Sequence, residues 1–158
     1  MQGANVSNGY VRSFQAGDAA RVAAHLRDAD MAEIAAHSGS TPYAALCRGV
    51  LGSEIACTVC SADATPVAVF GVGAGGVVWL LGTDALTTSP LAKQFLRECR
   101  LHVALLQERY PLLHNVIDER NVVHIRWLRW MGFVFLRRIL HFGVGQRPFL
   151  EFARIKHV

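Results

Sequence analysis

Two cysteines stand at a spacing that metal sites use. Cys57 and Cys60 form a C-x-x-C pair, and such pairs bind zinc when a second pair of cysteines or histidines completes the site. No second pair follows at the spacing of a zinc finger. The run from Ile55 to Cys60 is typical of a strand, in which residues three apart point to opposite faces. We therefore predict no metal site and expect all four cysteines, Cys47 and Cys99 included, to be reduced thiols.

Arginine and tryptophan suggest a second kind of chemistry, the binding of a partner. The chain has 16 lysines and arginines against 12 acidic residues, a net charge of +4. A guanidinium group binds carboxylates and phosphates with two parallel hydrogen bonds, and tryptophan and arginine are enriched at the centres of protein interfaces. The interface candidates lie in two predicted helices: Lys93, Arg97, Arg100, Arg126, Trp127, Arg129 and Trp130.

The spacing of these residues supports a docking surface. Lys93, Arg97 and Arg100 recur at i, i+4 and i+7, which makes one stripe on a helix. Two tryptophans three residues apart on a short helix cannot easily both be core, so we expect a partner protein or a neighbouring subunit to cover one of them. A nucleic-acid partner is disfavoured because the basic residues are scattered and no DNA-reading motif is present. The plainer alternative is that these are solvated helix faces.

Length and composition limit the class of protein. A chain of 158 residues can bury the core of one domain, and we predict a single domain over residues 1–158. Hydrophobic residues make up 52% and charged residues 18%, which excludes a disordered segment. The apolar runs are far shorter than the roughly 20 residues of a membrane span. Residues 1–10 form a polar segment without the pattern of a signal peptide.

Hydrophobic periodicity and turn residues predict the elements that position these side chains. Asp18 is the expected N-cap of the first helix. Ser89 is the expected N-cap of the longest helix, with Pro90 as its first residue. The predicted strands are 11–15, 55–60, 66–72, 77–81, 113–117, 133–142 and 148–155, and the predicted helices are 18–39, 42–51, 90–110 and 122–131.

This order of strands and helices resembles the fold of the GCN5-related N-acetyltransferases. The segment from Asn121 to Phe133 also resembles the family's N-x-x-A-x-x-L-Y-x-x-x-G-F motif, with the asparagine and the Gly-Phe pair in register. The resemblance implies an α/β fold. It implies a mixed, mostly antiparallel sheet of about seven strands, flanked by about four helices.

Three stretches resemble more closely a family of short proteins from short-tailed phages. These are VVWLLGTDAL, FLRECRLHVALLQERYPLLHNVIDERNVVHIRWLRWMGFVF and the closing pair of strands. Members of that family are described either as acetyltransferase-like proteins or as internal virion proteins needed for particle assembly. The resemblance implies a location in the phage virion, and in the host cytoplasm during assembly, with other virion proteins or further copies of the chain as partners.

In an active member of the acetyltransferase fold, acyl-CoA lies where the fourth and fifth strands separate. Its pyrophosphate binds N–H groups at the start of the long helix, in a loop of pattern Q/R-x-x-G-x-G/A. Here only Ala92 fits that pattern, and Pro90 has no N–H to donate. We therefore expect no cofactor, or acetyl-CoA if the chain is an enzyme. The candidate contacts are Leu86, Thr87, Thr88, Ser89, Leu91, Ala92 and Asn121.

The catalytic residues that the resemblance implies are also incomplete. The family's general acid is a tyrosine, and Leu128 stands at that position. The candidates for a base are Asp84, Asp118, Glu119 and His124, and Asp118 and Glu119, at the end of the fifth predicted strand, are the best placed. Each has a structural alternative: Asp118 and Asn121 could cap the following helix, and His124 could be a packed or hydrogen-bonded side chain.

Two functional hypotheses follow from the resemblance. The first is a virion-associated structural or assembly protein with a degenerate acetyltransferase fold, acting through protein–protein contacts. The alternative is an active acyl-CoA-dependent N-acetyltransferase that modifies a protein or a small amine, since acetyl transfer to a neutral amine depends mostly on positioning.

Overall fold

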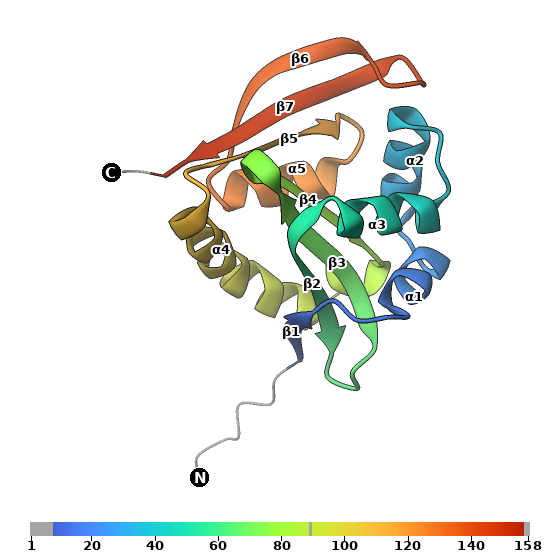
Figure 1. The fold of residues 1–158 in the computed structure, drawn as a ribbon, viewed down its shortest axis with the longest axis vertical. Helices are drawn as coiled ribbons and strands as arrows, with labels where there is room; N and C mark the ends of the chain where they lie inside the picture. Colours follow the sequence, from blue (N-terminus) through green and yellow to red (C-terminus); the bar gives the residue numbers. More distant parts are fainter. Residues whose placement is uncertain (1–7, 89, 157–158) are drawn as a thin grey trace.

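The computed structural model describes residues 8–88 and 90–156. These residues form a seven-stranded sheet of order β1-β2-β3-β4-β5-β7-β6 (Figure 1). Neighbouring strands are antiparallel except β4 and β5, which are parallel. The mixed, mostly antiparallel sheet expected from the sequence is confirmed. The strands are β1 Gly9–Ser13, β2 Ser53–Ser61, β3 Pro66–Gly73, β4 Val77–Gly82, β5 Leu112–Asp118, β6 Val134–Phe142 and β7 Arg147–Ile155.

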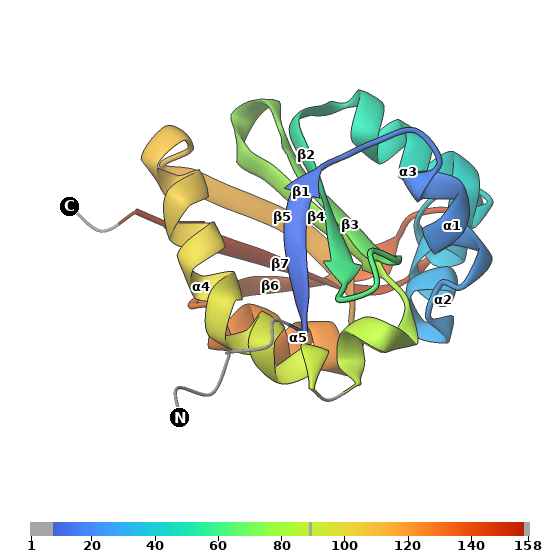
Figure 2. The same cartoon turned by 90° about the horizontal axis from the view of Figure 1, so that it is seen from below.

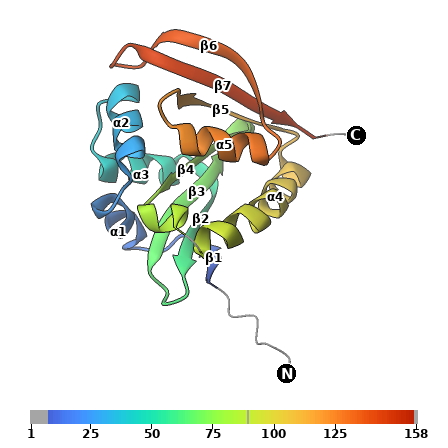
Figure 3. The ribbon, with the colours of Figure 1, turned by 180° about the vertical axis from the view of Figure 1, so that it is seen from behind.

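Five α-helices of the described residues cover the two faces of this sheet. α4 and α5 lie on one face and α1, α2 and α3 on the other (Figures 2 and 3). No described helix is long and apolar enough to cross a membrane. The helices are α1 Asp18–Ala24, α2 Asp28–His37, α3 Pro42–Leu51, α4 Leu91–Arg109 and α5 Val122–Trp130, with short 3-10 turns η1 Ala74–Gly76 and η2 Asp84–Thr87.

Apolar side chains are buried on both faces of the sheet. On one face, Leu113 of β5 packs in a cluster with Leu128 of α5. On the other, Val69 of β3 packs with Val22 of α1 and Leu46 of α3. Apolar residues at helical spacing therefore fix which side of each helix faces the sheet.

The single helix expected over residues 18–39 is wrong, because the chain forms two helices there. Leu26 pairs with Thr83 as an isolated β-bridge, and the N–H of Arg27 donates to the carbonyl of Gly82 (3.0 Å). These contacts replace helical hydrogen bonds with bonds to the end of β4. The break gives α2 its own start beside the sheet.

Two predicted caps are also corrected. Gly17 occupies the N-cap of α1, and the Asp18 carboxylate instead binds Arg12 (2.7 Å) and the Thr58 hydroxyl (2.6 Å). Pro90 occupies the N-cap of α4, which begins at Leu91 rather than at the proline. The predicted cap Ser89 lies outside the described residues.

Candidate functional site between β4 and β5

The parallel strands β4 and β5 separate soon after they meet. They pair only at Val77 and His114. Beyond this pair, the Asn115 side chain lies between them: its Nδ2 donates to the carbonyl of Val78 (2.8 Å), and its Oδ1 accepts from the N–H of Val116 (2.8 Å). One side-chain amide thus takes the place of a backbone bond, and a wedge opens.

Peptide groups of β4 face this wedge. Alternate residues of a strand face the same neighbour, and Val78 and Gly82 both bond on the side away from β3. The N–H and carbonyl of Leu80, which lies between them, therefore point toward the opening. An extended chain with amide groups could bond there as a strand does.

A cavity of about 610 Å³ occupies the wedge. Its lining is mainly apolar and comes from both faces of the sheet, with Phe95 and Trp127 on one side and Ile34 and Ala45 on the other. Leu128, which replaces the expected tyrosine, also lines it and has no hydroxyl to donate a proton. The cavity suits a mostly apolar ligand.

Two carboxyl groups of α2 close the wide end of the wedge. Asp30 accepts a hydrogen bond from the N–H of Gly82 at the end of β4 (3.0 Å). Glu33 accepts one from the N–H of Asp118 at the end of β5 (3.0 Å). One helix therefore bonds the last peptide groups of both diverging strands.

Asn121, His124 and Arg27 complete this buried network. The Asn121 amide donates to Asp30 (3.0 Å) and Glu33 (3.3 Å). Arg27 contacts Asp30 (3.4 Å) and donates to Nε2 of His124. A guanidinium has no acceptor, so Nε2 of the imidazole must accept, which leaves the proton of neutral His124 on Nδ1. Every member of the network except Glu33 is less than 8% exposed.

Burial shifts the pKa values of this network toward neutral forms. Desolvation raises the pKa of Glu33 to about 8 and that of Asp30 to about 6. Desolvation, with the nearby Arg27 charge, lowers the pKa of His124 to about 3. At neutral pH, His124 is uncharged and a poor proton acceptor. Glu33, which lines the cavity, exchanges its proton near neutral pH.

The predicted bases Asp118, Glu119 and Asp84 do not line the cavity. Burial alone would raise the pKa of Asp118, but hydrogen bonds from Arg120 outweigh burial and lower it. The side chain of Asp118 bonds Arg120, including its backbone N–H, so it orders the turn before α5 rather than capping the helix. Hydrogen bonds from Arg138 lower the pKa of Glu119.

His124 and Asn121 are the sequence candidates that the structure brings together. His124 lines the cavity, stacks on Trp127 (4.9 Å between ring centroids) and is held by Arg27. Asn121 stands at the N-cap of α5, but its side chain makes no capping bond and joins the buried network instead. Sequence reasoning missed Arg27, Asp30 and Glu33.

The start of α4 does not offer a cradle for a diphosphate among the described residues. The N–H of Ala92 already donates to the carbonyl of Thr88 (2.9 Å). The hydroxyls of Thr87 and Thr88 both donate to the carbonyl of Asp84 (2.8 Å each). Pro90 has no N–H. Pro90 and Ala92 therefore supply no free N–H to the pyrophosphate of acyl-CoA, so the fit of the described residues to that group is poor.

The remaining cofactor candidates are apolar. Leu86 is fully buried in the core, and Leu91 is buried and lines the cavity. Neither side chain can bind a phosphate group.

The interface candidates divide into exposed and buried side chains. Lys93, Arg97, Arg100, Arg126 and Arg129 are exposed, and Trp130 is 46% exposed. Trp127 is 9% exposed and packs on Phe95 (5.0 Å between ring centroids). The assignment of Trp127 to an interface is therefore corrected: the chain itself covers this ring.

Solved structures of acetyltransferases share this architecture. An N-acetyltransferase from Staphylococcus aureus Mu50 aligns with a TM-score of 0.68 at 14% identity, over 94% of this chain and 99% of the other. A phosphinothricin acetyltransferase from Sinorhizobium meliloti, in complex with AcCoA, aligns with a TM-score of 0.67 at 13% identity, over 94% and 89%. An acetyltransferase from Bacillus anthracis aligns with a TM-score of 0.66 at 10% identity, over 96% of each chain. The fold is that of the GCN5-related N-acetyltransferases.

The family itself is shown by the sequence. Residues 56–139, more than half of the chain, match the family model described as "Bacteriophage T7, probable scaffold protein Gp13". The chain belongs to this family, which supports the expected link to bacteriophage proteins. A comparison with curated proteins finds no match.

Proposed function

We propose that this chain is a structural or assembly component of a phage virion, and that it uses an acetyltransferase fold for protein–protein contacts rather than for catalysis. The start of α4 carries the proposal. The fold binds the diphosphate of its cofactor there, and in this chain Pro90 lacks an N–H while that of Ala92 is already bonded. A lost hydrogen bond to a charged group costs about 1.5–3 kcal/mol, or roughly tenfold or more in affinity.

Two further observations support a non-catalytic role. Leu128 stands where the fold's general acid would be, and the buried His124 has a pKa lowered to about 3. Membership of a family described as a scaffold protein agrees with an assembly role. On this proposal the chain binds other virion proteins or further copies of itself, in the virion and in the host cytoplasm during assembly.

Calorimetric titration with acetyl-CoA tests the proposal. We expect no saturable heat up to millimolar acetyl-CoA from a sample whose cooperative melting shows that it is folded. Pro90→Gly, which supplies an N–H at that position, is the matched variant, and any affinity that it gains assigns the loss to the proline. Micromolar binding of acetyl-CoA by the unaltered chain contradicts the proposal. So does a mass-spectrometric inventory of purified virions in which the chain is absent.

A second candidate function, acyl-CoA-dependent N-acetyl transfer, is favoured by one observation. The cavity between β4 and β5 is open, and Glu33 lines it with a pKa raised to about 8. For such an enzyme, Glu33→Gln would abolish transfer from acetyl-CoA to a lysine peptide or a polyamine. Asp118→Asn, which alters a carboxyl group away from the cavity, would leave the transfer rate within about tenfold.

A further inference from the structure

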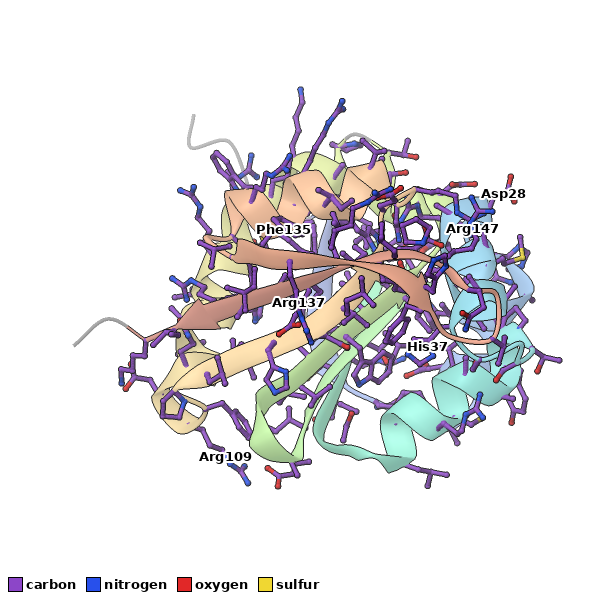
Figure 4. All side chains as sticks on the ribbon, turned by 90° about the horizontal axis from the view of Figure 1, so that it is seen from above. Asp28, His37, Arg109, Phe135, Arg137 and Arg147 are labelled. Carbon is purple, nitrogen blue, oxygen red and sulfur yellow. The ribbon has the colours of Figure 1, made fainter. Side chains whose placement is uncertain are left out.

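The ion pairs of the described residues leave one part of the surface strongly positive. Seven lysines and arginines elsewhere pair with carboxylates: on β6, for example, Arg137 bonds Glu151 and Arg138 bonds Glu119. The other four described cations outside this part form no such pair with a described residue and are divided among α1, α3 and β7: Arg21, Arg48, Arg147 and Arg154. Figure 4 shows Arg137 on the side of β6 away from α5, and Phe135 on the side toward it. The cations in carboxylate pairs are Arg12, Arg27, Arg109, Arg120, Arg137, Arg138 and Lys156.

Five exposed cations of α4 and α5 form no such pair with a described residue, whereas Arg109 at the end of α4 pairs with Glu54. With Trp130 they make up what we call the α4–α5 patch: Lys93, Arg97, Arg100, Arg126, Arg129 and Trp130. Glu98 lies on the same helix, but it accepts a hydrogen bond from Gln94 (3.1 Å) and pairs with none of the five. The patch therefore has an excess of positive charge that no carboxylate among the described residues neutralises.

Trp130 is held rigidly within this patch. Its Nε1 donates to the carbonyl of Leu96 (2.8 Å), and its own carbonyl accepts from Nε of Arg100 (2.8 Å). The Arg100 guanidinium lies 3.8 Å from the centre of the ring. A fixed aromatic side chain loses little entropy when a partner covers it, so it is a favourable anchor.

Exposed leucines continue the patch along α4. Arg97, Leu101 and Leu105 follow at i, i+4 and i+8, one ridge of the helix. Leu101 is 62% exposed and Leu105 is 60% exposed. Protein interfaces combine arginine and aromatic anchors with apolar area in this way.

The composition of the patch favours protein over nucleic acid. One face of the Trp130 ring is already covered by Arg100, so that face cannot stack on a base. The leucines gain nothing from a phosphate backbone, whereas apolar side chains of a protein would cover them. A second copy placed patch to patch would bring like charges together. We infer that the α4–α5 patch binds an acidic segment of a partner protein, with carboxylates on the arginines and apolar side chains on Trp130 and Leu101.

This inference rests on the proposed assembly function and identifies the chemistry of its partner. Fluorescence anisotropy with three labelled probes tests it: a peptide of glutamates with interspersed leucines, a peptide with the same number of glutamates and glycine in place of leucine, and a DNA duplex. We expect the Glu/Leu peptide to bind at least about tenfold more tightly than the Glu/Gly peptide. We also expect salt to weaken its binding.

Matched variants separate the patch from net charge. Arg97→Glu with Arg126→Glu, and Arg21→Glu with Arg48→Glu, each lower the formal net charge from +4 to 0. The first pair of substitutions is expected to lower the affinity for the Glu/Leu peptide by at least about tenfold. The second pair, on α1 and α3, is expected to lower it by less than about twofold. Trp130→Ala should remove the preference for leucine. Circular dichroism and melting establish that each variant is folded.

Three results overturn the inference: DNA binding that is tighter than either peptide, equal loss in both charge-reversed pairs, or no peptide binding at all. The protein composition of purified virions then distinguishes failure of the inference about the α4–α5 patch from failure of the proposed assembly function. If the unaltered chain is still found in purified virions, the inference fails and the assembly function stands. If it is absent, the assembly function fails as well.

Discussion

The charge state of Glu33 couples the wedge to pH. Its pKa is raised from an ordinary 4.5 to about 8 by burial, so the folded chain binds a proton there that the unfolded chain releases above pH 4.5. The free energy of unfolding therefore falls as pH rises from 4.5 to 8. His124 acts in the opposite sense, because its lowered pKa removes stability as pH falls from 6.5 toward 3.

Glu33→Gln tests this coupling. Glutamine keeps an acceptor for the N–H of Asp118 and never ionises, so the variant loses the part of the decline that Glu33 causes; the part due to Asp30, whose pKa is raised to about 6, remains. We expect equal stability at pH 4.5 and a variant more stable by on the order of 3 kcal/mol at pH 8, measured by urea denaturation. Glu108→Gln, which removes an exposed carboxylate of α4, is the control for the loss of one negative charge. Parallel curves for Glu33→Gln and the unaltered chain would show that Glu33 ionises normally.

Part of the candidate site could be predicted from the sequence. Asn121 and His124 stand in a recognisable motif, and both lie in the buried network. Asp30 gave a weaker signal, because it recurs with apolar residues at helical spacing. Its partners Gly82 and Asn121 are 52 and 91 positions away, so only the folded chain reveals why a carboxyl group occupies an apolar face.

The helix α2 depends on the tip of the β6–β7 hairpin. The N–H groups of Val144 and Gly145 donate to the last carbonyls of α2, those of His37 (3.3 Å) and Ala36 (2.9 Å). Gly143 has a φ of +67°, and a Cβ there would lie 2.4 Å from the carbonyl oxygen of Ala36. The hairpin thus holds the helix that supplies Asp30 and Glu33.

Gly143→Ala should destabilise the chain through both conformation and contact. The left-handed conformation costs about 1–2 kcal/mol, and crowding adds about 1–3 kcal/mol. Gly75→Ala is the matched control, because Gly75 has a φ of +74° with nothing near its missing Cβ, so it incurs only the first cost. Chemical denaturation measures both. Equal losses would mean that the hairpin moves freely away from α2.

The order of elements was predictable because each strand and helix has its own hydrophobic period and turn residues. The break between α1 and α2 was not, because Leu26 leaves the helix to pair with Thr83, a contact that no local pattern contains. The wedge was not predictable for the same reason. The sequence of residues 113–117 is that of an ordinary strand, and only the fold places the Asn115 side chain between β5 and β4.

Two of the three tryptophans, both on α5, lie in unlike surroundings. Trp127 fills the core between α4 and α5, whereas Trp130 lies on the positive surface. The mutations that impair folding and those that impair assembly should therefore separate at these two positions.

Trp127→Ala should cost about 3–5 kcal/mol of stability. Trp130→Ala should cost about 1–2 kcal/mol, since it removes one hydrogen bond and one cation–π contact. Combined with Arg126→Ala, Trp130→Ala should yield a folded chain that is missing from virions. Denaturation curves and virion composition measure the two effects. Similar losses of stability at both tryptophans would contradict the separation.

The position of β7 has a consequence for synthesis. β7 lies between β5 and β6, although it is the last of the described strands along the chain. β6 leaves the ribosome earlier and finds no neighbour in the sheet until residues 147–155 emerge. The nascent chain must therefore carry an unmatched, partly apolar strand until β7 has emerged, which makes this interval the one in which a chaperone, or a neighbouring nascent chain, has access to it.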